Sequence, residues 1–552
     1  MLPSIVSISG VSISGISIPA FLFANNTAAV LQGWVDSLTD DTFKGIHHLA
    51  PFDYAILVPY FAVLAVLSMY GLHRYEMIRG YMKNRALWHH QPPLRFDQLP
   101  RVTVQLPIYN EQYVVERLLA EVLKIDYPRE LFEVQVLDDS TDETHPFTQS
   151  LVREYALAGH PITYIHRNNR HGYKAGALEN GLQTATGELV AVFDADFVPP
   201  VDFLRRTVDY FADPQVGMVQ TRWTYLNRYQ NLLTEVQAIL LDGHFVLEHI
   251  ARAGGGLFFN FNGTGGVLRR SMIQDAGGWQ HDTLTEDSDL SYRAQLKGWK
   301  FVYAPAVECP SELPAETYGF QVQQSRWAKG LTQVAMKLLP TILRSNLPWR
   351  VKAEAFFHLT PNISYPLMVV VTALILPVMI VRFYMGWLEI LLIDLPLIAA
   401  SFWSISAFYV IAQRELFPHN WKRSLLFLPA LMSAGVALTI INTRAVIEAL
   451  VGYQTAFART PKYGQGKPLA QDAAVKYRRR SGWLPYAELA LGTGFLFVMV
   501  YAIDSFNYMA LPFLMLFVGG YYWAGITTLW DEYRNKLAFE RQRALAAERA
   551  EA

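Results

Sequence analysis

The sequence is poor in cysteine and in charged residues, and each shortage excludes a class of protein. Cys309 is the single cysteine among 552 residues, so no intrachain disulfide can form, as is usual in a reducing compartment. Charged residues make up 17% of the chain and hydrophobic residues 52%, whereas soluble proteins carry about 25% charge. The formal net charge of -1 gives no reason to expect a nucleic-acid partner. The composition instead favours helices that are buried or face lipid.

Long apolar runs lie on both sides of a middle section of ordinary polarity. A membrane-spanning helix needs about 20 mostly apolar residues. Residues 54–74 form one such run, residues 344–412 an interfacial segment and two runs, and residues 483–530 two more. Residues 1–53 form a leader without the basic start of a secretory signal, and we expect it to be non-cytoplasmic. The sequence therefore predicts a multi-pass protein of the plasma or inner membrane, and it leaves open whether residues 5–30 form a further span.

Basic loops set the predicted topology. The stretch HRYEMIRGYMKNR, the loops QRELFPHNWKR and KYRRRSG, and the tail segment NKLAFERQR are all basic, and the positive-inside rule places them in the cytoplasm. Four crossings after the middle section satisfy this rule, and five do not. We therefore interpret residues 424–482 as an interfacial helix and a cytoplasmic loop, with an ordinary span at 424–443 as the alternative. Residues 531–552 are expected to form a charged helix that serves as a cytoplasmic tail, with no chemical role and no cyclic-dinucleotide module.

The middle section, residues 95–343, alternates strand patterns with helix patterns. The strand segments are RVTVQLPIYNE, FEVQVLDDSTDET, ITYIHR and ELVAVFDADFVPP. This alternation predicts an α/β domain with a mostly parallel sheet, inserted between the membrane helices on their cytoplasmic side. In such sheets ligands bind at the carboxyl ends of the strands. Two acidic clusters follow strands in this way, Asp138-Asp139 and Asp194-Ala195-Asp196.

The Asp194-Ala195-Asp196 cluster is a candidate metal site. Two carboxylates separated by one residue can converge on Mg²⁺ or Mn²⁺, which take oxygen ligands and bridge phosphates. A bound cation would stabilise a diphosphate leaving group. One such pair alone is as well explained by a solvated turn, and the second acidic cluster favours the site. Lys174 stands at a turn before a helix and could face the phosphates, with Gly176 permitting close approach, although a surface lysine is the simpler explanation for this motif alone.

Two further motifs carry candidate residues for an acceptor and for proton transfer. The stretch GGLFFNFNGTGG has glycines that would admit a sugar ring and phenylalanines that could form an apolar wall, unless it is a hairpin in the core. Thr285-Glu286-Asp287 opens a predicted helix. Carboxylates there are favoured by the helix dipole alone, but one of them could accept the proton of an attacking sugar hydroxyl. Inverting transfer needs one such base and no covalent intermediate.

The stretch YGFQVQQSRWAKG is predicted to be helical and precedes the first downstream span. Gln323, Arg326 and Trp327 project from adjacent turns of this helix. An arginine can pair with a diphosphate, and a tryptophan can stack on a sugar. An interfacial helix with a tryptophan anchor is the alternative.

Together these motifs resemble the processive membrane synthases of glycosyltransferase family two, in particular cellulose-synthase-like proteins of the mannan and glucomannan type. The phrases VLDDSTD, GYKAGAL, FDADF, FNGTGG, EDSDL, LKGWKF and QQSRW carry the resemblance, in this order. It implies a GT-A-type domain. It also implies polymerisation of glucose or mannose, from UDP-glucose or GDP-mannose, and export of the glycan.

The resemblance implies a role for each motif residue. Asp138 or Asp139 would hold the nucleotide base, and Asp287 would be the general base. The diphosphate would be held by Lys174, Asp194, Gln323 and Arg326, and the metal by Asp194 and Asp196. The acceptor would be held by Phe259, Asn262, Gly263, Thr264, Glu286 and Trp327. The segment AFARTPKYG resembles a gating loop, with Phe457, Arg459, Thr460 and Lys462 as its residues, and Arg459 stands where an aliphatic residue is commoner.

Two rival functions stay open at this point. A single-transfer enzyme that adds one sugar to a lipid, like the glucosylceramide synthases, shares the DxD and RW motifs. The resemblance to a gating loop favours the synthase. A non-catalytic glycan-binding membrane component would be expected to lack a catalytic carboxylate, yet Asp194, Asp196 and Asp287 are all present.

Overall fold

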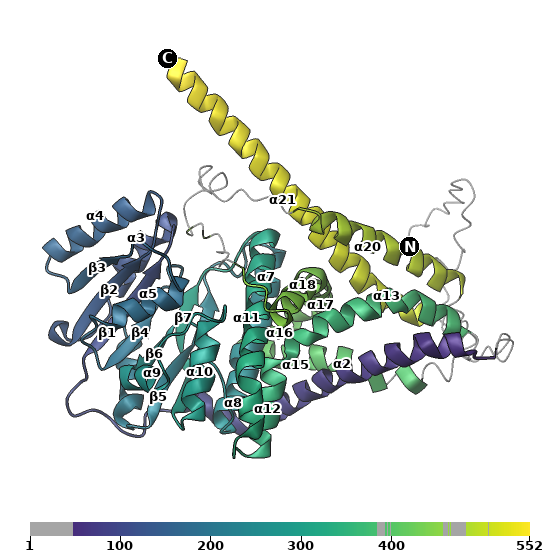
Figure 1. Cartoon of the computed structure of the whole chain (residues 1–552), viewed down its shortest axis with the longest axis horizontal. Coiled ribbons are helices and arrows are strands. Elements are labelled where there is room, and N and C mark those ends of the chain that lie inside the picture. The colour runs from purple at the N-terminus through teal and green to yellow at the C-terminus, as the bar shows by residue number, and fades with distance from the viewer. Residues whose placement is uncertain are drawn as a thin grey trace, which may run out of the picture.

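The computed structural model describes residues 48–551 apart from 384–391, 395, 398, 456–461, 463, 465–481 and 506. A sheet domain and a bundle of long helices lie side by side, and the helix α11 (Thr317–Arg344) stands between them (Figure 1). Residues 1–47 of the leader and most of the loop around residue 460 lie outside the described residues.

A seven-stranded sheet forms the centre of the first domain. Its strands are β1 (Val102–Ile108), β2 (Phe132–Asp138), β3 (Ile162–His166), β4 (Leu189–Val192), β5 (Val216–Tyr225), β6 (Gly266–Arg269) and β7 (Lys300–Ser311). Their order is β3-β2-β1-β4-β6-β5-β7, and β6 alone runs antiparallel to its neighbours. The mostly parallel sheet predicted from the sequence is therefore confirmed.

Helices cover both faces of this sheet. The helices of the domain are α3 (Gln112–Val122), α4 (Thr144–Leu157), α5 (Tyr173–Leu182), α6 (Phe203–Thr207), α7 (Leu232–Asp242), α8 (His249–Gly254), α9 (Arg270–Asp275) and α10 (Glu286–Leu296), with the π-helical turn η5 (Gly243–Glu248) and the 3-10 turns η2 (Arg85–His89), η3 (Arg129–Leu131) and η4 (Val208–Ala212).

The strand β4 shows how the sheet packs between two apolar layers. All four of its residues are buried. Leu189 and Ala191 belong to the core on the α3 side, whereas Val190 and Val192 belong to the core that includes α5, α8 and α9. Successive side chains of a strand point to opposite faces, so a continuously apolar strand is typical of a parallel sheet covered on both sides.

The second part of the molecule consists of long helices. Its elements are α2 (Pro51–Asn84), α12 (Trp349–Leu359), η6 (Pro361–Ile363), α13 (Ser364–Arg382), η8 (Ala399–Trp403), α15 (Ser404–Leu416), α16 (Trp421–Ser424), η9 (Leu425–Phe427), α17 (Leu428–Ala437), α18 (Thr439–Leu450), α20 (Leu484–Asp504), η10 (Tyr508–Ala510) and α21 (Leu511–Glu551).

Five helices among the described residues are long and apolar enough to cross a membrane. They are Pro51–His89, Pro361–Arg382, Leu392–Leu416, Leu484–Asp504 and Leu511–Leu537. The helices Trp421–Ala437 and Thr439–Leu450 form a bent pair with an angle of 42° between them, as in a broken span or a re-entrant loop. The interfacial interpretation of residues 424–443 stays a prediction.

The sheet domain and the helix bundle share one core. Met77 and Tyr81 of α2 and Phe408 of α15 belong to the same apolar cluster as Leu178 of α5. A Cβ added at Gly80 of α2 would come within 2.9 Å of the Ala251 Cβ in α8, so these helices touch closely. This contact explains why α2 extends to Asn84, well beyond the predicted run 54–74. The sheet domain is therefore held at a fixed position against the bundle.

Candidate active site

A cavity of about 470 Å³ opens at the carboxyl ends of β1, β2 and β4, where α11 faces the sheet. Most of the sequence motifs contribute residues to its wall, whereas the stretch LKGWKF does not. The predicted site residues on its wall are Asp139, Lys174, Asp194, Asp196, Asn262, Gly263, Glu286, Asp287, Gln323, Arg326, Trp327 and Lys462.

Strand pairing brings the DxD cluster and the glycine-rich loop together. Because β6 runs antiparallel to β4, Val192 at the end of β4 pairs with Gly266 at the start of β6. The residues that follow β4 and those that precede β6 therefore meet. The Asp194 backbone N–H donates to Thr264 Oγ1 at 2.8 Å. Thr264 is 1% exposed, so it positions the DxD turn from behind and does not line the cavity.

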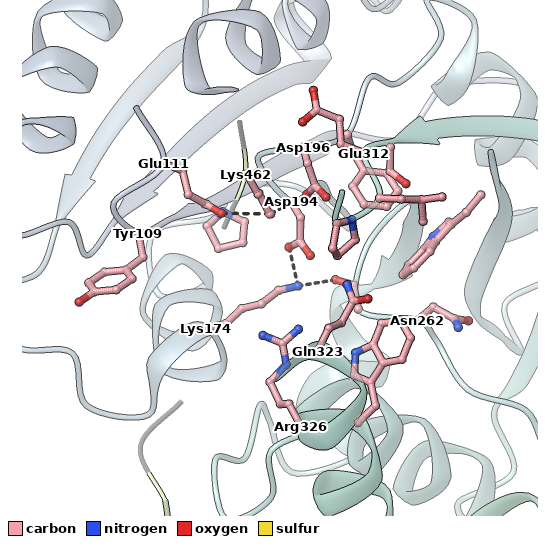
Figure 2. Close-up of a pocket in the computed structure, with 18 of the residues that line it drawn as sticks. Tyr109, Glu111, Lys174, Asp194, Asp196, Asn262, Glu312, Gln323, Arg326 and Lys462 are labelled. Atoms are coloured by element: carbon pink, nitrogen blue, oxygen red, sulfur yellow. Dashed lines mark hydrogen bonds and ion pairs between the residues drawn. The ribbon is translucent and has the colours of Figure 1, made fainter. Parts of the chain in front are cut away.

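Both DxD carboxylates face lysine ammonium groups in the cavity (Figure 2). Lys174 Nζ lies 2.6 Å from Asp194 Oδ1 and donates to the Gly263 carbonyl oxygen at 2.9 Å. Lys462 Nζ lies 2.6 Å from Asp196 Oδ1. Each carboxylate thus contacts a cation directly, and the pair marks a place that favours positive charge.

The surroundings shift the pKa values of Asp194 and Asp196 in opposite directions. Burial alone would raise the pKa of Asp194, but Lys174 and Lys462 outweigh it, so the pKa is lowered. Burial raises the pKa of Asp196, and Lys462 only partly offsets this effect. Asp194 is therefore the more strongly ionised partner of the pair.

Asp287 lies across the cavity from the sheet, in the first turn of α10. Burial and the neighbouring Glu286 carboxylate raise the pKa of Asp287 to about 7. Its Oδ1 accepts a hydrogen bond from the Ser288 backbone N–H at 2.7 Å. A carboxylate with a pKa near neutrality is suited to accept a proton and then release it.

The helix α11 brings three predicted residues to the cavity and packs against the segment that carries Asp287. Gln323, Arg326 and Trp327 line the cavity wall, and Figure 2 shows Gln323 and Arg326 rising from this helix. A Cβ added at Gly330, one turn later, would come within 2.8 Å of the Thr285 backbone nitrogen. Gly330 thus permits the close contact that sets the α11 residues opposite Asp287.

The structure separates Asp138 from Asp139. Asp138 is 0% exposed and accepts hydrogen bonds from the Ser140 backbone N–H at 2.8 Å and the Tyr164 hydroxyl at 2.5 Å. Asp139 lines the cavity and accepts a hydrogen bond from Arg167 Nε at 2.7 Å. Of the two, Asp139 is placed to contact a ligand.

The cavity does not include Phe259. Its side chain is 1% exposed and packs edge to face on Phe301 and near His249, in the core below the glycine-rich loop. Phe259, which was expected to contact the acceptor, is thus a core residue. The loop instead turns Asn262 and Gly263 toward the cavity.

Several cavity residues were not identified from the sequence. They are Tyr109, Glu111, Arg170, Trp223, Glu312 and Arg534. Tyr109 and Glu111 directly follow β1, so the rule that ligands bind at strand ends would have identified them. Arg534 comes from α21, in the tail from which no chemical role was expected, and it pairs with Glu316 at 3.3 Å. No local pattern in the sequence identifies it, since only the path of α21 brings it to the cavity.

The predicted gating loop is described only at its edges. Phe457, Arg459 and Thr460 lie outside the described residues, whereas Lys462 contacts Asp196 and also Glu111, at 3.0 Å. The segment before the loop is held to α11. Lys329 Nζ, in a 4% exposed side chain, donates to Glu448 Oε2 at 2.9 Å and to Thr455 Oγ1 at 3.0 Å.

A second cluster of possible metal ligands lies behind Asp139. Ligand atoms of Asp138, His145 and His166 come within 4.8 Å of one another. The Tyr164 hydroxyl, however, contacts both Asp138 Oδ2 and His145 Nδ1, at 2.5 and 2.6 Å. Asp138, Tyr164 and His145 are therefore better described as a hydrogen-bonded triad that fixes the end of β2.

Comparison with known proteins places the sequence in a family. Residues 100–330 match the family described as glycosyltransferase like family 2. Glucomannan 4-beta-mannosyltransferase 1 of Oryza sativa subsp. japonica is 42% identical over 262 residues, which are 46% of this chain and 50% of that protein. Glucomannan 4-beta-mannosyltransferase 7 of Arabidopsis thaliana is 33% identical over 449 residues, which are 77% of each chain. The chain thus spans about half the length of the rice relative and most of the Arabidopsis relative.

Among solved structures, the mannosyltransferase PcManGT from Pyrobaculum calidifontis, in complex with GDP-Man and Mn²⁺, is similar at 25% identity. It has a TM-score of 0.48, over 65% of this chain and 99% of that one. On the match to the Arabidopsis relative over most of both sequences, this chain belongs to glycosyltransferase family two, together with the cellulose-synthase-like glucomannan mannosyltransferases.

Proposed function

We propose that this protein is a processive, inverting β-glycosyltransferase that polymerises glucose or mannose from a nucleotide-sugar donor and exports the glycan. One observation carries the proposal. The DxD carboxylates, Asp287 and Trp327 converge on a single cavity beside the helix that leads into the membrane bundle. The names of the curated relatives, which are mannosyltransferases, favour mannose over glucose as the transferred sugar.

The donor would lie between the strand ends and α11. Asp139 would hold the nucleotide base, and Lys174, Gln323 and Arg326 would hold the diphosphate. All four residues line the cavity. Burial lowers the pKa of Arg326, although Glu286 and Asp194 partly offset this. A cation in a largely dry cavity gains more from a diphosphate than it would in water.

Asp194 and Asp196 would hold Mg²⁺ or Mn²⁺. The fit rests on their oxygen ligands and on the two lysine ammonium groups that already lie 2.6 Å from them, which stand in for a cation. When bound, the ion would neutralise charge that develops on the departing diphosphate.

Asp287 would act as the general base. The acceptor hydroxyl oxygen forms a bond to the anomeric carbon while the bond to the diphosphate oxygen breaks, and the hydroxyl proton passes to Asp287. The nucleoside diphosphate leaves with the electron pair. A single displacement of this kind inverts the anomeric configuration, and it needs no covalent sugar–enzyme intermediate.

The membrane helices would provide the export path, with the sheet domain in the cytoplasm. Polar side chains lie inside the bundle, close to α11. Gln321 Nε2 donates to Glu488 Oε1 at 3.1 Å, and the Thr372 and Tyr521 hydroxyls are 3.2 Å apart. Polar groups buried between membrane helices often mark the route of a substrate.

The raised pKa of Asp287 predicts an acidic limb in the pH profile. Only the ionised carboxylate can accept a proton, so kcat/KM for the donor should fall about tenfold per unit as pH drops below about 7. Initial rates between pH 5 and 9 at fixed metal concentration measure this. A limb centred near pH 4 would show that Asp287 keeps an ordinary pKa.

Gly263→Ala should lower transfer about 100-fold, because a displacement of reacting groups near 1 Å has this effect. Gly263 has a φ of +81°, and its added Cβ would lie 2.8 Å from Asp287 Oδ2. Gly256→Ala is the matched control, since Gly256 has a φ of +64° and no neighbour within 4 Å. Equal rates for the two variants would mean that the Gly263–Asp287 contact does not matter for transfer.

The direct test of function is a product assay. The protein is purified in lipid nanodiscs and supplied separately with radiolabelled GDP-mannose and UDP-glucose, with Mg²⁺ or Mn²⁺. We expect a long polymer from one donor that a β-mannanase or a β-glucanase degrades. A labelled lipid carrying one sugar would instead identify a single-transfer enzyme.

A further inference from the structure

Asn262 lies on the cavity wall, and two histidines hold both ends of its side-chain amide. Its Nδ2 lies 2.9 Å from His244 Nε2, and its Oδ1 lies 2.6 Å from His249 Nε2. Its backbone N–H donates to Gln220 Oε1 at 2.9 Å. The amide therefore cannot rotate without breaking two hydrogen bonds.

The π-helical turn η5 makes this arrangement possible. Residues five apart in an α-helix point about 140° away from each other. In this segment the His244 and His249 rings are 4.3 Å apart. Such π-turns are frequent at functional sites. The two rings thus reach one amide from the same side.

Glu248 sets the direction of the hydrogen bonds. Its Oε2 lies 2.9 Å from His244 Nδ1 and accepts a hydrogen bond from Arg252 Nη1 at 3.0 Å. Burial would raise the pKa of Glu248, but Arg252 and His244 outweigh it and hold the pKa well below its usual range. A carboxylate only accepts, so His244 donates through Nδ1. In its neutral form, His244 must then accept at Nε2.

The remaining directions follow from this one. Asn262 donates to His244 through Nδ2 and presents Oδ1 to His249, which must donate through Nε2. His249 Nδ1 then carries no hydrogen, and it is buried without a partner among the described residues. Burial also keeps the pKa of His249 well below its ordinary value, as a neutral ring requires. With the amide reversed, its oxygen would face the His244 Nε2 acceptor and its NH₂ group would face the His249 Nε2–H donor. Both hydrogen bonds would be lost.

The hydrogen-bond network continues to the membrane helix α2, which anchors it. Arg252 Nε donates to Glu354 Oε1 of α12 at 2.8 Å. Glu354 Oε2 lies 2.8 Å from His73 Nε2 of α2. The side chains of Arg252 and Glu354 are 3% and 5% exposed. Glu248 is therefore held in place from the side opposite the cavity.

We infer that His244 and His249 are positioning residues that fix which end of the Asn262 amide faces the acceptor sugar. This inference rests on the proposed transfer to a glycan. Nδ2 carries two hydrogens, of which His244 takes one, and the other can donate to a hydroxyl oxygen of the acceptor. In this orientation the amide would hold the end of the acceptor glycan next to the donor, so that the glycan and not water attacks the donor sugar.

The test compares two substitutions of His249 in nanodiscs. His249→Gln places an amide N–H near the position of Nε2, whereas His249→Asn places it nearer the position of Nδ1. We measure the fraction of consumed donor that enters glycan rather than free hexose, and the affinity for GDP or UDP with Mn²⁺. His249→Asn should lower this fraction about tenfold, the effect of one lost hydrogen bond to an ordered partner. His249→Gln should stay near the wild-type value, and nucleotide affinity should change in neither variant.

Equal fractions for the wild-type protein and His249→Asn would overturn the inference, as would a parallel loss of nucleotide affinity and melting temperature in both variants. If the wild-type protein makes no glycan, the proposed function fails instead. The tautomers are then still measured by ¹⁵N NMR of histidine-labelled protein, assigned with His244→Gln and His249→Gln. We expect Nδ1–H for His244 and Nε2–H for His249, and the opposite pattern would overturn the inference.

Discussion

Replacing Asp287 by asparagine should lower the rate of sugar transfer by about 10²- to 10⁴-fold, the usual contribution of a general base. The amide has the same shape, but it cannot accept the proton of the attacking hydroxyl. Affinity for the nucleoside diphosphate should hardly change, because Asp139, Lys174 and Arg326 remain in place. Initial rates with radiolabelled donor and calorimetric titration of the nucleotide measure the two effects.

Glu308→Gln is the matched control for this substitution. Glu308 lies on β7 with its side chain 56% exposed, and it is not part of the cavity wall. The transfer rate of this variant should stay within about twofold of the wild-type value, because the change leaves every residue of the cavity wall in place. If Asp287→Asn kept most of the activity, the base would have to be another group, and Glu286 is the neighbouring carboxylate on the wall.

Asp196→Asn should weaken the binding of Mn²⁺ by at least about 100-fold, since loss of an outer-sphere partner alone costs 10- to 100-fold. The change removes one carboxylate from the pair and leaves Lys462 with Glu111 as its partner. Donor binding and transfer should fall with the metal. Titration of Mn²⁺ by electron paramagnetic resonance measures the affinity directly.

Asp202→Asn is the control for the metal prediction, because Asp202 also follows β4 in the chain but has a 56% exposed side chain and lies outside the cavity. Chelation of the wild-type protein should abolish transfer, and added Mg²⁺ or Mn²⁺ should restore it. Full activity after chelation would contradict the assigned role of Asp194 and Asp196.

The strand-end rule explains how much of the site the sequence could predict. Runs rich in apolar residues located β1, β2 and β4, and the polar residues that follow them do meet in one cavity. The rule works because parallel strands place their carboxyl ends at one edge of the sheet. It could not choose between Asp138 and Asp139, since that depends on Tyr164 and Arg167, which come from distant parts of the chain.

The glycine-rich loop shows the limit of motif reasoning. Composition indicated a site for a sugar, and Asn262 and Gly263 do lie on the wall. Phe259 and Thr264 are 1% exposed and face away from it. A short irregular loop with several glycines lacks the regular periodicity of a helix or strand, so its sequence does not show in which direction each side chain points. Packing of the loop against β5 and α8 determines these directions instead.

Long-range packing also explains the position of Arg534 on the cavity wall and the length of α2. The sequence predicted a charged helix after the last span, and α21 does continue from Leu511 to Glu551, but its path also brings Arg534 to the cavity. Similarly, α2 continues past its apolar run because Met77 and Tyr81 join the core of the sheet domain. Neither feature has a local signal, because each depends on where a helix meets another part of the molecule.

The measurement that tests the central claim most directly is a pulse-chase of the product in nanodiscs. A brief pulse of radiolabelled donor is followed by excess unlabelled donor, and product length is followed in the wild-type protein and in Asp287→Asn. We predict labelled chains that stay with the protein and keep growing during the chase, and no labelled chain with Asp287→Asn. Label that remains in a single-sugar lipid, or chains that form equally with Asp287→Asn, would contradict the assignment of processive transfer to this cavity.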